Sequence, residues 1–342
     1  MNTPIFDSAL LPSDREFDRM KSNLFELIEE AGNESAPHLV PVTTKRKRPY
    51  RRAAWATVFG VAAATLAVML VATNVFGPHA ATAEAAEVLH SAALAAIKSS
   101  DPVVGPGQFL KVETTEVALS FYRESAYEQP QSITLYVPAD RSSTWLLGRQ
   151  DLPPGKSYGD AKSNINNYWS DPDRGTLRLY QAPGGNFGGR PYGFPGEIAK
   201  MPRDGDALLR YLYDHAVGSH SKEEAIFSQI KEALRTGLVP ADLRAAMYQA
   251  LANLPGVYLA QGQTNLDGQA GVAISRKEPS RPWVDQIIID PTTGLLIGVC
   301  DVVATGQWDP VPAGTVADWT AVKTSVVDQL PAGPYAVMPP DG

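Results

Sequence analysis

The feature that most constrains this chain is a basic cluster that leads directly into a long uncharged apolar run. The run, residues 53–77, contains no Asp, Glu, Lys or Arg, and only Asn74 in it is strongly polar. A helix needs about 20 apolar residues to cross the hydrocarbon core of a bilayer, so this run can span it with some tilt. The cluster before it holds six basic side chains: Lys45, Arg46, Lys47, Arg48, Arg51 and Arg52.

The position of these charges predicts the orientation of the span. Lys and Arg gather on the cytoplasmic side of a membrane helix, and here they all precede the run, since the next basic residue is Lys98. We therefore expect a single-pass protein of the cell membrane, with residues 1–52 in the cytoplasm and residues 78–342 outside. The alternative is a cleaved signal peptide, for which Ala81-Thr82-Ala83 offers a cleavage pattern. A signal peptide has a short n-region and about 7 to 15 apolar residues, which favours a retained span.

The predicted cytoplasmic tail contains one amphipathic helix, residues 14–31. Ser13 and Glu16 have the spacing of a capping box, and Gly32 ends the pattern. One face of this helix is apolar, and it consists of Phe17, Met20, Leu24, Leu27 and Ile28. A lone helix of about 18 residues is marginal in water, so this face needs a cover. Two covers remain open, the bilayer surface and the groove of a partner protein.

Charge and cysteine content narrow the classes of ligand and site. Residues 1–52 carry a net charge of +1 and residues 53–342 carry −8, within a total of −7. An acidic outer part does not favour nucleic acid as a partner, and the basic cluster is better explained as a topology signal that also contacts anionic lipid. Cys300 is the only cysteine, so no intramolecular disulfide can form, and its apolar surroundings predict a buried side chain.

The outer part alternates between strand and helix patterns in three blocks. A helix is expected over residues 80–98, and strands over 108–121, 132–137 and 143–148. A helical insertion follows at 204–253, after a Gly/Pro-rich stretch at 183–196 that we expect to be a mobile surface loop or a loop that closes on a ligand. The last block contains strands joined by tight turns at Asp267-Gly268 and at 290–294. This order predicts an α+β domain with an antiparallel sheet.

Motifs that would indicate catalysis or metal binding are not found in the sequence. It has no Gly-x-Ser-x-Gly, His-Glu-x-x-His or P-loop pattern. His215 and His220 are five residues apart, which does not place two ligands on one helical face, and Asp204-Gly205-Asp206 fits a helix cap better than a calcium loop. We therefore expect no catalytic residues, no cofactor and no metal.

Four short segments form a recognisable set: the basic cluster with its apolar run, Asp101-Pro102 followed by 106–109, the helical stretch 243–257, and the turn 289–296. Together they resemble a family of uncharacterised actinobacterial membrane proteins that is often associated with sigma-factor genes. The order of helices and strands is also similar to the concave-sheet fold of periplasmic lipoprotein carriers and of sensors that regulate envelope-stress sigma factors. The resemblance implies an outer sensing or binding domain and a cytoplasmic partner such as a sigma factor.

Two functions follow as expectations. The first is a non-enzymatic sensor whose outer domain binds an envelope lipid or peptide and whose tail contacts a sigma factor. The tail lacks the His and Cys pattern of zinc-containing anti-sigma domains. The second is a membrane-tethered module that binds lipid or lipoprotein acyl chains without signalling, since a concave sheet with scattered Trp side chains suits an apolar ligand.

Overall fold

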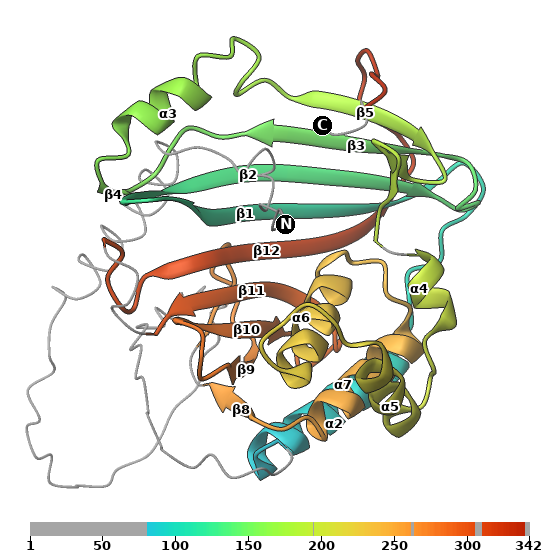
Figure 1. Cartoon of the computed structure of the whole chain (residues 1–342). Helices are drawn as coiled ribbons and strands as arrows, with labels where there is room; N and C mark the ends of the chain where they lie inside the picture. The colour runs from blue at the N-terminus through green and yellow to red at the C-terminus, as the bar shows by residue number, and fades with distance from the viewer. Residues whose placement is uncertain (1–80, 194, 261–262, 305–309, 339–342) are drawn as a thin grey trace, which may run out of the picture.

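The computed structural model describes residues 81–193, 195–260, 263–304 and 310–338 (Figure 1). The amphipathic helix predicted over 14–31, the basic cluster and the apolar run at 53–77 lie outside these residues. Among the residues described, no helix combines the length and the apolar character needed to cross a membrane.

One large antiparallel sheet organises the described part of the chain. Its strands follow the order β5-β3-β2-β1-β12-β11-β10-β9-β8, with β4 paired to β2 beside this path. The strands are β1 (Phe109–Tyr122), β2 (Ser125–Pro138), β3 (Thr144–Asp151), β4 (Ser157–Gly159), β5 (Arg178–Pro183), β8 (Val257–Ala260), β9 (Val272–Lys277), β10 (Trp283–Ile289), β11 (Leu296–Val303) and β12 (Val316–Val327). A separate two-stranded sheet joins β6 (Asn186–Phe187) and β7 (Arg190–Pro191).

Helices cover one face of this sheet, and four of them gather beside its β8–β11 half (Figure 1). The helices are α2 (Ala83–Ser99), α3 (Lys162–Tyr168), α4 (Pro195–Lys200), α5 (Gly205–His215), α6 (Lys222–Arg235) and α7 (Ala241–Ala252). Three begin at a side-chain cap, in which Thr82, Asp204 and Ser221 accept a backbone N–H of the first turn. The Thr82 N–H also donates to the Val257 carbonyl at 2.9 Å, which ties the start of α2 to β8.

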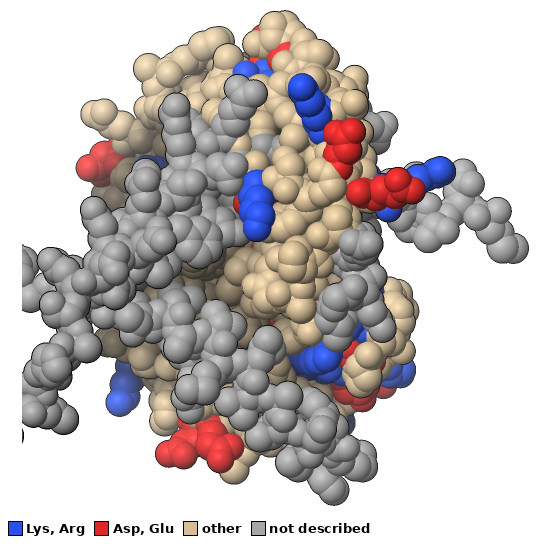
Figure 2. Space-filling view, turned by 90° about the vertical axis from the view of Figure 1, so that its left-hand side faces the viewer, with Lys and Arg blue, Asp and Glu red and all other residues tan. Residues whose placement is uncertain are grey.

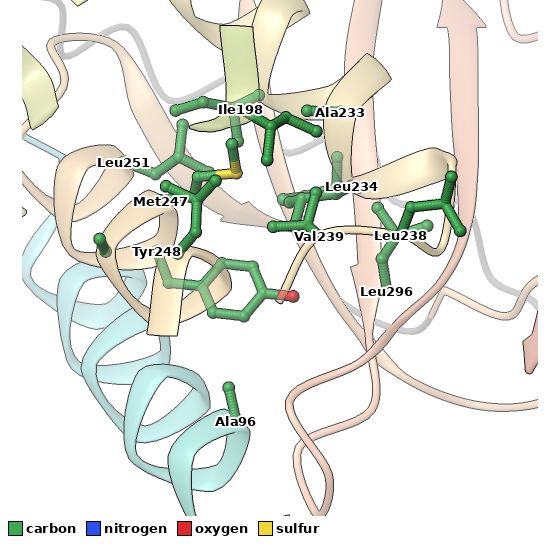
Figure 3. Close-up of a cluster of buried hydrophobic side chains, with 14 of the residues drawn as sticks. Ala96, Ile198, Ala233, Leu234, Leu238, Val239, Met247, Tyr248, Leu251 and Leu296 are labelled. Carbon is green, nitrogen blue, oxygen red and sulfur yellow. The ribbon is translucent and has the colours of Figure 1, made fainter. Parts of the chain in front are cut away.

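The main hydrophobic core lies between these helices and the covered face of the sheet. It forms because each helix presents an apolar stripe and each strand presents alternate apolar side chains to the same space. Members that are fully buried include Leu89, Leu135, Leu208, Leu212, Ile226, Ile230, Leu243, Met247, Ile274 and Ile287. Figure 3 shows the part of this core where α6, α7 and β11 meet, with Leu234, Met247 and Leu296 close together.

The two halves of the sheet are joined at β12. β1 pairs with β12 along ten successive positions, from Phe109 opposite Val327 to Ala118 opposite Asp318. β11 pairs with β12 only near one end, where Cys300 lies opposite Trp319 and Asp301 opposite Asp318. The sheet is therefore continuous at this junction over a short distance only.

The predicted α+β class with an antiparallel sheet is confirmed. The helical insertion predicted over 204–253 consists of α5, α6 and α7, and the tight turns at Asp267-Gly268 and 290–294 lie between paired strands. β2 is longer than the predicted 132–137, because it begins at Ser125 and continues through Pro130. Its polar residues find partners in neighbouring chain segments, as when Tyr158 Oη and Lys156 N donate to Glu128.

Within the Gly/Pro-rich stretch 183–196, predicted to be a loop, residues 186–191 form the β6–β7 hairpin, which has both buried and exposed positions. Phe187 is buried and lies edge-on to Tyr192, with ring centroids 6.3 Å apart. Gly185 lies against Trp145, where a Cβ would meet the indole ring at 2.5 Å. The glycines allow the backbone to approach β3 closely, and the aromatic side chains then bury area that offsets the entropy of ordering the segment.

Three of the segments that carry the family resemblance meet in space. Arg244 Nη2 of α7 donates to Asp101 Oδ1 at 3.2 Å, and Tyr248 Oη of the same helix donates to the Gly294 carbonyl at 2.9 Å. Gly294, in the β10–β11 turn, has φ +65° and lies against α2, where a Cβ would be 2.5 Å from the Ala92 carbonyl oxygen. The turn, α2 and α7 therefore form one packed unit.

This packing makes Gly294 and Gly268 a matched pair of glycines. Both have positive φ, but a Cβ at Gly268 meets nothing within 4 Å. We expect Gly268→Ala to lower the unfolding free energy by about 1 to 2 kcal/mol, the cost of the left-handed conformation. Gly294→Ala adds about 1 to 3 kcal/mol of overpacking. Chemical denaturation of the two variants measures the difference, and equal losses would contradict the close packing of the turn on α2.

Candidate functional site

The residues that the sequence singled out for topology and partner contact lie outside the described residues. They are Lys45, Arg46, Lys47, Arg48, Arg51 and Arg52 of the basic cluster, and Phe17, Met20, Leu24, Leu27 and Ile28 of the tail. Their roles stay predictions. The candidate site lies instead among residues of the folded domain that the sequence does not single out.

Helix α6 brings two basic side chains onto the sheet. It starts at the Ser221 cap, carries Glu223 and Glu224 in its first turn, and ends at Arg235, which suits the helix dipole at both ends. Lys231 and Arg235 are four residues apart and therefore share one face of the helix. That face also carries apolar core residues, so Lys231 is only 6% exposed. A lysine this deeply buried requires a partner.

The sheet supplies the partners as carboxylates on adjacent strands. Asp301 of β11 lies opposite Asp318 of β12, and the register of β10 and β11 places Asp285 opposite Asp301. Glu116 of β1 lies close by, since Ala118 of the same strand is opposite Asp318. Like charges directly opposite one another destabilise a sheet, so this arrangement depends on cations from elsewhere.

Lys231 and Arg235 neutralise these carboxylates through direct contacts. Lys231 Nζ donates to Asp285 Oδ1 at 2.5 Å and to Asp301 Oδ2 at 2.6 Å. Arg235 Nη1 donates to Asp318 Oδ2 at 2.7 Å, and Arg235 Nη2 donates to Glu116 Oε1. We call these six residues the charged clasp: Glu116, Lys231, Arg235, Asp285, Asp301 and Asp318.

The clasp contains four carboxyl groups and two cations, and the pKa of Asp301 within it is raised. Burial raises it to about 7, from an ordinary value of 3.8; Lys231 opposes the shift, and Asp285 and Asp318 reinforce it. The pKa of Asp318 is raised too, first by burial and then by Glu116, against the effect of Arg235. Lys231 keeps its charge, because its carboxylate partners outweigh the effect of burial and raise its pKa. The Asp301 carboxyl group can therefore bind or release a proton near neutral pH.

Further polar side chains extend the clasp across the sheet. Gln131 of β2 donates from Nε2 to Glu116 Oε2 at 2.8 Å. Ala118 of β1 lies between Asp318 and Gln129 in one row across the sheet. Within the described structure, Asp318 Oδ1 and Gln129 Oε1 have no hydrogen-bond partner. At the β3–β5 edge, Asp151 accepts from Arg174 at 3.0 Å and from Arg178 at 2.7 Å. The covered face is thus polar along one band and apolar elsewhere.

The exposed charges of the domain are less concentrated. Figure 2 shows, on the described part of one face, small groups of acidic and basic side chains with uncharged surface between the groups. The dense grouping of charge is the buried clasp. Perturbed titratable groups of this kind gather at functional sites more often than elsewhere, although structural ion pairs share the property.

His215, His220 and Cys300 take part in contacts within the fold. The His215 ring stacks on Tyr211 with centroids 4.1 Å apart, and the His220 backbone N–H donates to Glu224 Oε2 at 2.8 Å. Across residues 81–338 where described, no group of three or more His, Cys, Asp or Glu side chains is placed to hold a metal ion. Cys300 is buried as predicted, and burial raises the pKa of its thiol.

Single acidic residues inside apolar strands were the sequence signal for this site. Asp285 stands within Trp283–Ile289 and Asp301 within Leu296–Val303, where an unpaired charge would be costly. Lys231 similarly interrupts the apolar stripe of α6. The signal identifies buried charges, but only the register of the sheet shows that they meet.

Comparison with known proteins adds no relative: the chain matches no family model, no curated protein and no solved structure. The resemblance described above therefore stays a prediction, and the function has to be argued from the geometry of the domain.

The arrangement can bind or release a proton near neutral pH, because the pKa of Asp301 is about 7. A buried ion-pair cluster contributes little net stability compared with apolar side chains of the same size, but removal of one partner leaves the other charges buried and unpaired. The contact between α6 and the sheet is therefore sensitive to the charge of the clasp.

We expect Lys231→Met to lower the unfolding free energy by about 3 to 5 kcal/mol, because Asp285 and Asp301 lose their buried cation. The control is Lys222→Met on the same helix, where the exposed Lys222 donates only to the Tyr213 carbonyl; its cost should stay within about 0.5 kcal/mol. Adding Asp285→Asn and Asp301→Asn to Lys231→Met should recover much of the loss. Urea unfolding of the full-length chain in detergent micelles measures all three, and equal losses for the two Met variants would contradict the clasp.

The raised pKa of Asp301 predicts how stability depends on pH. A carboxyl whose pKa is higher in the folded state stabilises the fold below its unfolded pKa, near 3.8, and loses this contribution as pH rises to about 7. The groups that face it are Lys231, Asp285 and Asp318. Relative to Asp301→Asn, the wild type should lose stability between pH 5 and pH 7, by at most about 1.4 kcal/mol per pH unit. Parallel pH profiles of the two proteins would refute the assignment.

Proposed function

We propose that this chain is a single-pass membrane protein whose outer α+β domain is a non-enzymatic sensing module that signals to a cytoplasmic partner. The observation that carries the proposal is the charged clasp, since it holds one helix on the sheet through groups whose charge changes near neutral pH. A signalling domain needs an element with two arrangements that a signal can bias, and we propose α6 as that element. The basic cluster and the apolar run at 53–77 supply the expected membrane anchor.

The packing of the helices supports a route from the clasp towards the membrane. α6 continues through the short connection 236–240 into α7, and α7 packs along α2. α2 begins at Ala83, shortly after the predicted span ends at Gly77. A shift of α6 therefore acts on the helix that is joined to the predicted anchor, through contacts between packed side chains.

The predicted tail helix supplies the cytoplasmic end of this route. Its apolar face needs a cover, and a groove on a partner protein would provide one. We propose a sigma factor as that partner, in line with the family resemblance. The bilayer would then contact the basic cluster through its anionic head groups.

The second expected function, binding of lipid or lipoprotein acyl chains, has no specific observation in its favour. The side chains of α6, α7 and the β6–β7 hairpin fill the covered face of the sheet. Two pockets in the described structure have volumes of about 180 Å³ each. Sites for drug-sized ligands have volumes of about 300 to 1,000 Å³.

The proposal predicts which cytoplasmic protein is captured with the chain. Full-length protein isolated from native membranes should bring down a sigma factor, and a version without residues 1–44 should not. Leu24→Asp should abolish recovery by placing a charge in the apolar face. Ser22→Asp adds the same charge to the opposite face of the predicted helix and should leave recovery unchanged.

Mass spectrometry of the captured proteins decides the result. If a sigma factor is recovered equally with Leu24→Asp and Ser22→Asp, the tail helix is not the contact. If the full-length chain and the truncated chain capture the same envelope components and no cytoplasmic protein, the signalling role is wrong.

A further inference from the structure

The charged clasp holds a primary amine in contact with two carboxyl groups. Lys231 Nζ lies 2.5 Å from Asp285 Oδ1 and 2.6 Å from Asp301 Oδ2. The three side chains are nearly excluded from water, since 7% of the lysine and 11% of each aspartate are exposed. They come from three separate elements, α6, β10 and β11, so the folded chain itself brings them together (Figure 1). An amine and a carboxyl group in contact contain the atoms of one amide bond and one water molecule.

The contact between Lys231 and Asp285 has the geometry from which an amide can form. Reacting atoms in a productive arrangement lie about 3 to 3.5 Å apart. Because Nζ lies 2.5 Å from a carboxyl oxygen of Asp285, the carboxyl carbon, one bond further away, is at about this distance. Groups held in this way react as if one were present at a concentration of about 10⁵ to 10⁸ M.

Burial also reduces the main obstacle to this reaction. In water an amine and an acid exchange a proton, and the resulting ammonium and carboxylate do not react with each other. Charges are costly to bury, so the neutral amine and the neutral acid lie closer in free energy to the ion pair here than in water. The carboxylates keep Lys231 charged most of the time. A small neutral fraction is sufficient for a slow step whose product persists.

Asp301 is placed to carry the proton that the reaction moves. Its Oδ2 accepts from Lys231 Nζ, and its Oδ1 accepts from the Gln286 backbone N–H at 3.0 Å, so the carboxyl group is held beside the amine. The pKa of Asp301, about 7, lets this group take a proton from the ammonium and return it. The two aspartates therefore have different roles, since Asp285 supplies the carbon and Asp301 transfers the proton.

We propose that Lys231 and Asp285 form an intramolecular amide bond, with Asp301 as the group that transfers the proton. Asp301 takes one proton from the Lys231 ammonium, and the nitrogen lone pair then forms a bond to Asp285 Cγ. The bond from Cγ to one carboxyl oxygen breaks, and this oxygen leaves as water with two of the three ammonium protons, one of them returned by Asp301. The third proton stays on the amide nitrogen. Atoms and charge balance without a further reactant, and Asp301 ends unchanged.

The bond would join α6 covalently to β10. Lys231 would become a fixed point of the helix, whereas Arg235, one turn further on, keeps its ionic contacts with Glu116 and Asp318 and stays sensitive to charge. The inference concerns the chemistry of the clasp and does not depend on the proposed function.

The test is the intact mass of the full-length protein, purified in detergent micelles and measured by mass spectrometry after denaturation. We expect a mass below that of the sequence by one water molecule. Lys231→Arg keeps the positive charge but cannot form this amide, so it should have the mass of its own sequence. The control Lys222→Arg makes the same change at an exposed position of α6 and should still lose water. A wild-type mass equal to that of the sequence would overturn the proposal, whether or not Lys231→Arg folds.

Digestion with trypsin locates the bond. Trypsin does not cleave after a lysine that carries an amide, so residues 223–235 should be recovered joined to residues 278–323 as one branched peptide. Fragmentation of this peptide should place the link between Lys231 and Asp285. A link to another aspartate, or a loss of water that maps to a different part of the chain, would contradict the assignment.

Variants of the two aspartates test their separate roles. Asp285→Ala removes the carbon that is attacked, so its mass should be that of its sequence. Asp301→Asn cannot transfer the proton and should slow the reaction about 100-fold or more, so that newly synthesised protein keeps its full mass. The control is Glu232→Gln, beside Lys231 on α6 with its side chain 52% exposed, and it should lose water as the wild type does. Equally rapid loss of water in Asp301→Asn would refute the role of Asp301.

Discussion

Three aspartates lie side by side on adjacent strands, two of them buried and Asp318 partly buried, and this is the constraint on which the rest of this domain depends. Asp285, Asp301 and Asp318 occupy opposed positions of β10, β11 and β12, and without cations their mutual repulsion would oppose the pairing of these strands. Lys231 and Arg235 reach them only if α6 lies across the sheet at this level. The charged clasp thus determines where the helical insertion returns to the sheet.

The other elements of the covered face follow from the position of α6. α7 follows it directly and packs on α2, and the β10–β11 turn closes against α2 through Gly294, whose lack of a Cβ allows the contact.

Local sequence signals predicted the elements of this fold better than its contacts. The helical insertion, the tight turns and the antiparallel class follow from periodicity, caps and turn residues, which act over a few residues. The hairpin at 186–191 was not predicted, because its order depends on Trp145, which lies far away in the sequence. The clasp was missed for the same reason: an isolated acid in an apolar strand indicates a buried charge, but its partner is set by strand register and by the path of the insertion.

The measurement that tests this account most directly is the titration of the Asp301 carboxyl group by carbon-13 NMR of the folded protein, with Asp301→Asn used to assign the signal. The account predicts a midpoint near 7, because burial and the neighbouring Asp285 and Asp318 favour the protonated form. A midpoint at or below the ordinary value of 3.8 would contradict it. Asp301 would then be fully ionised at neutral pH, and the clasp would be a static ion-pair cluster with no sensitivity to pH.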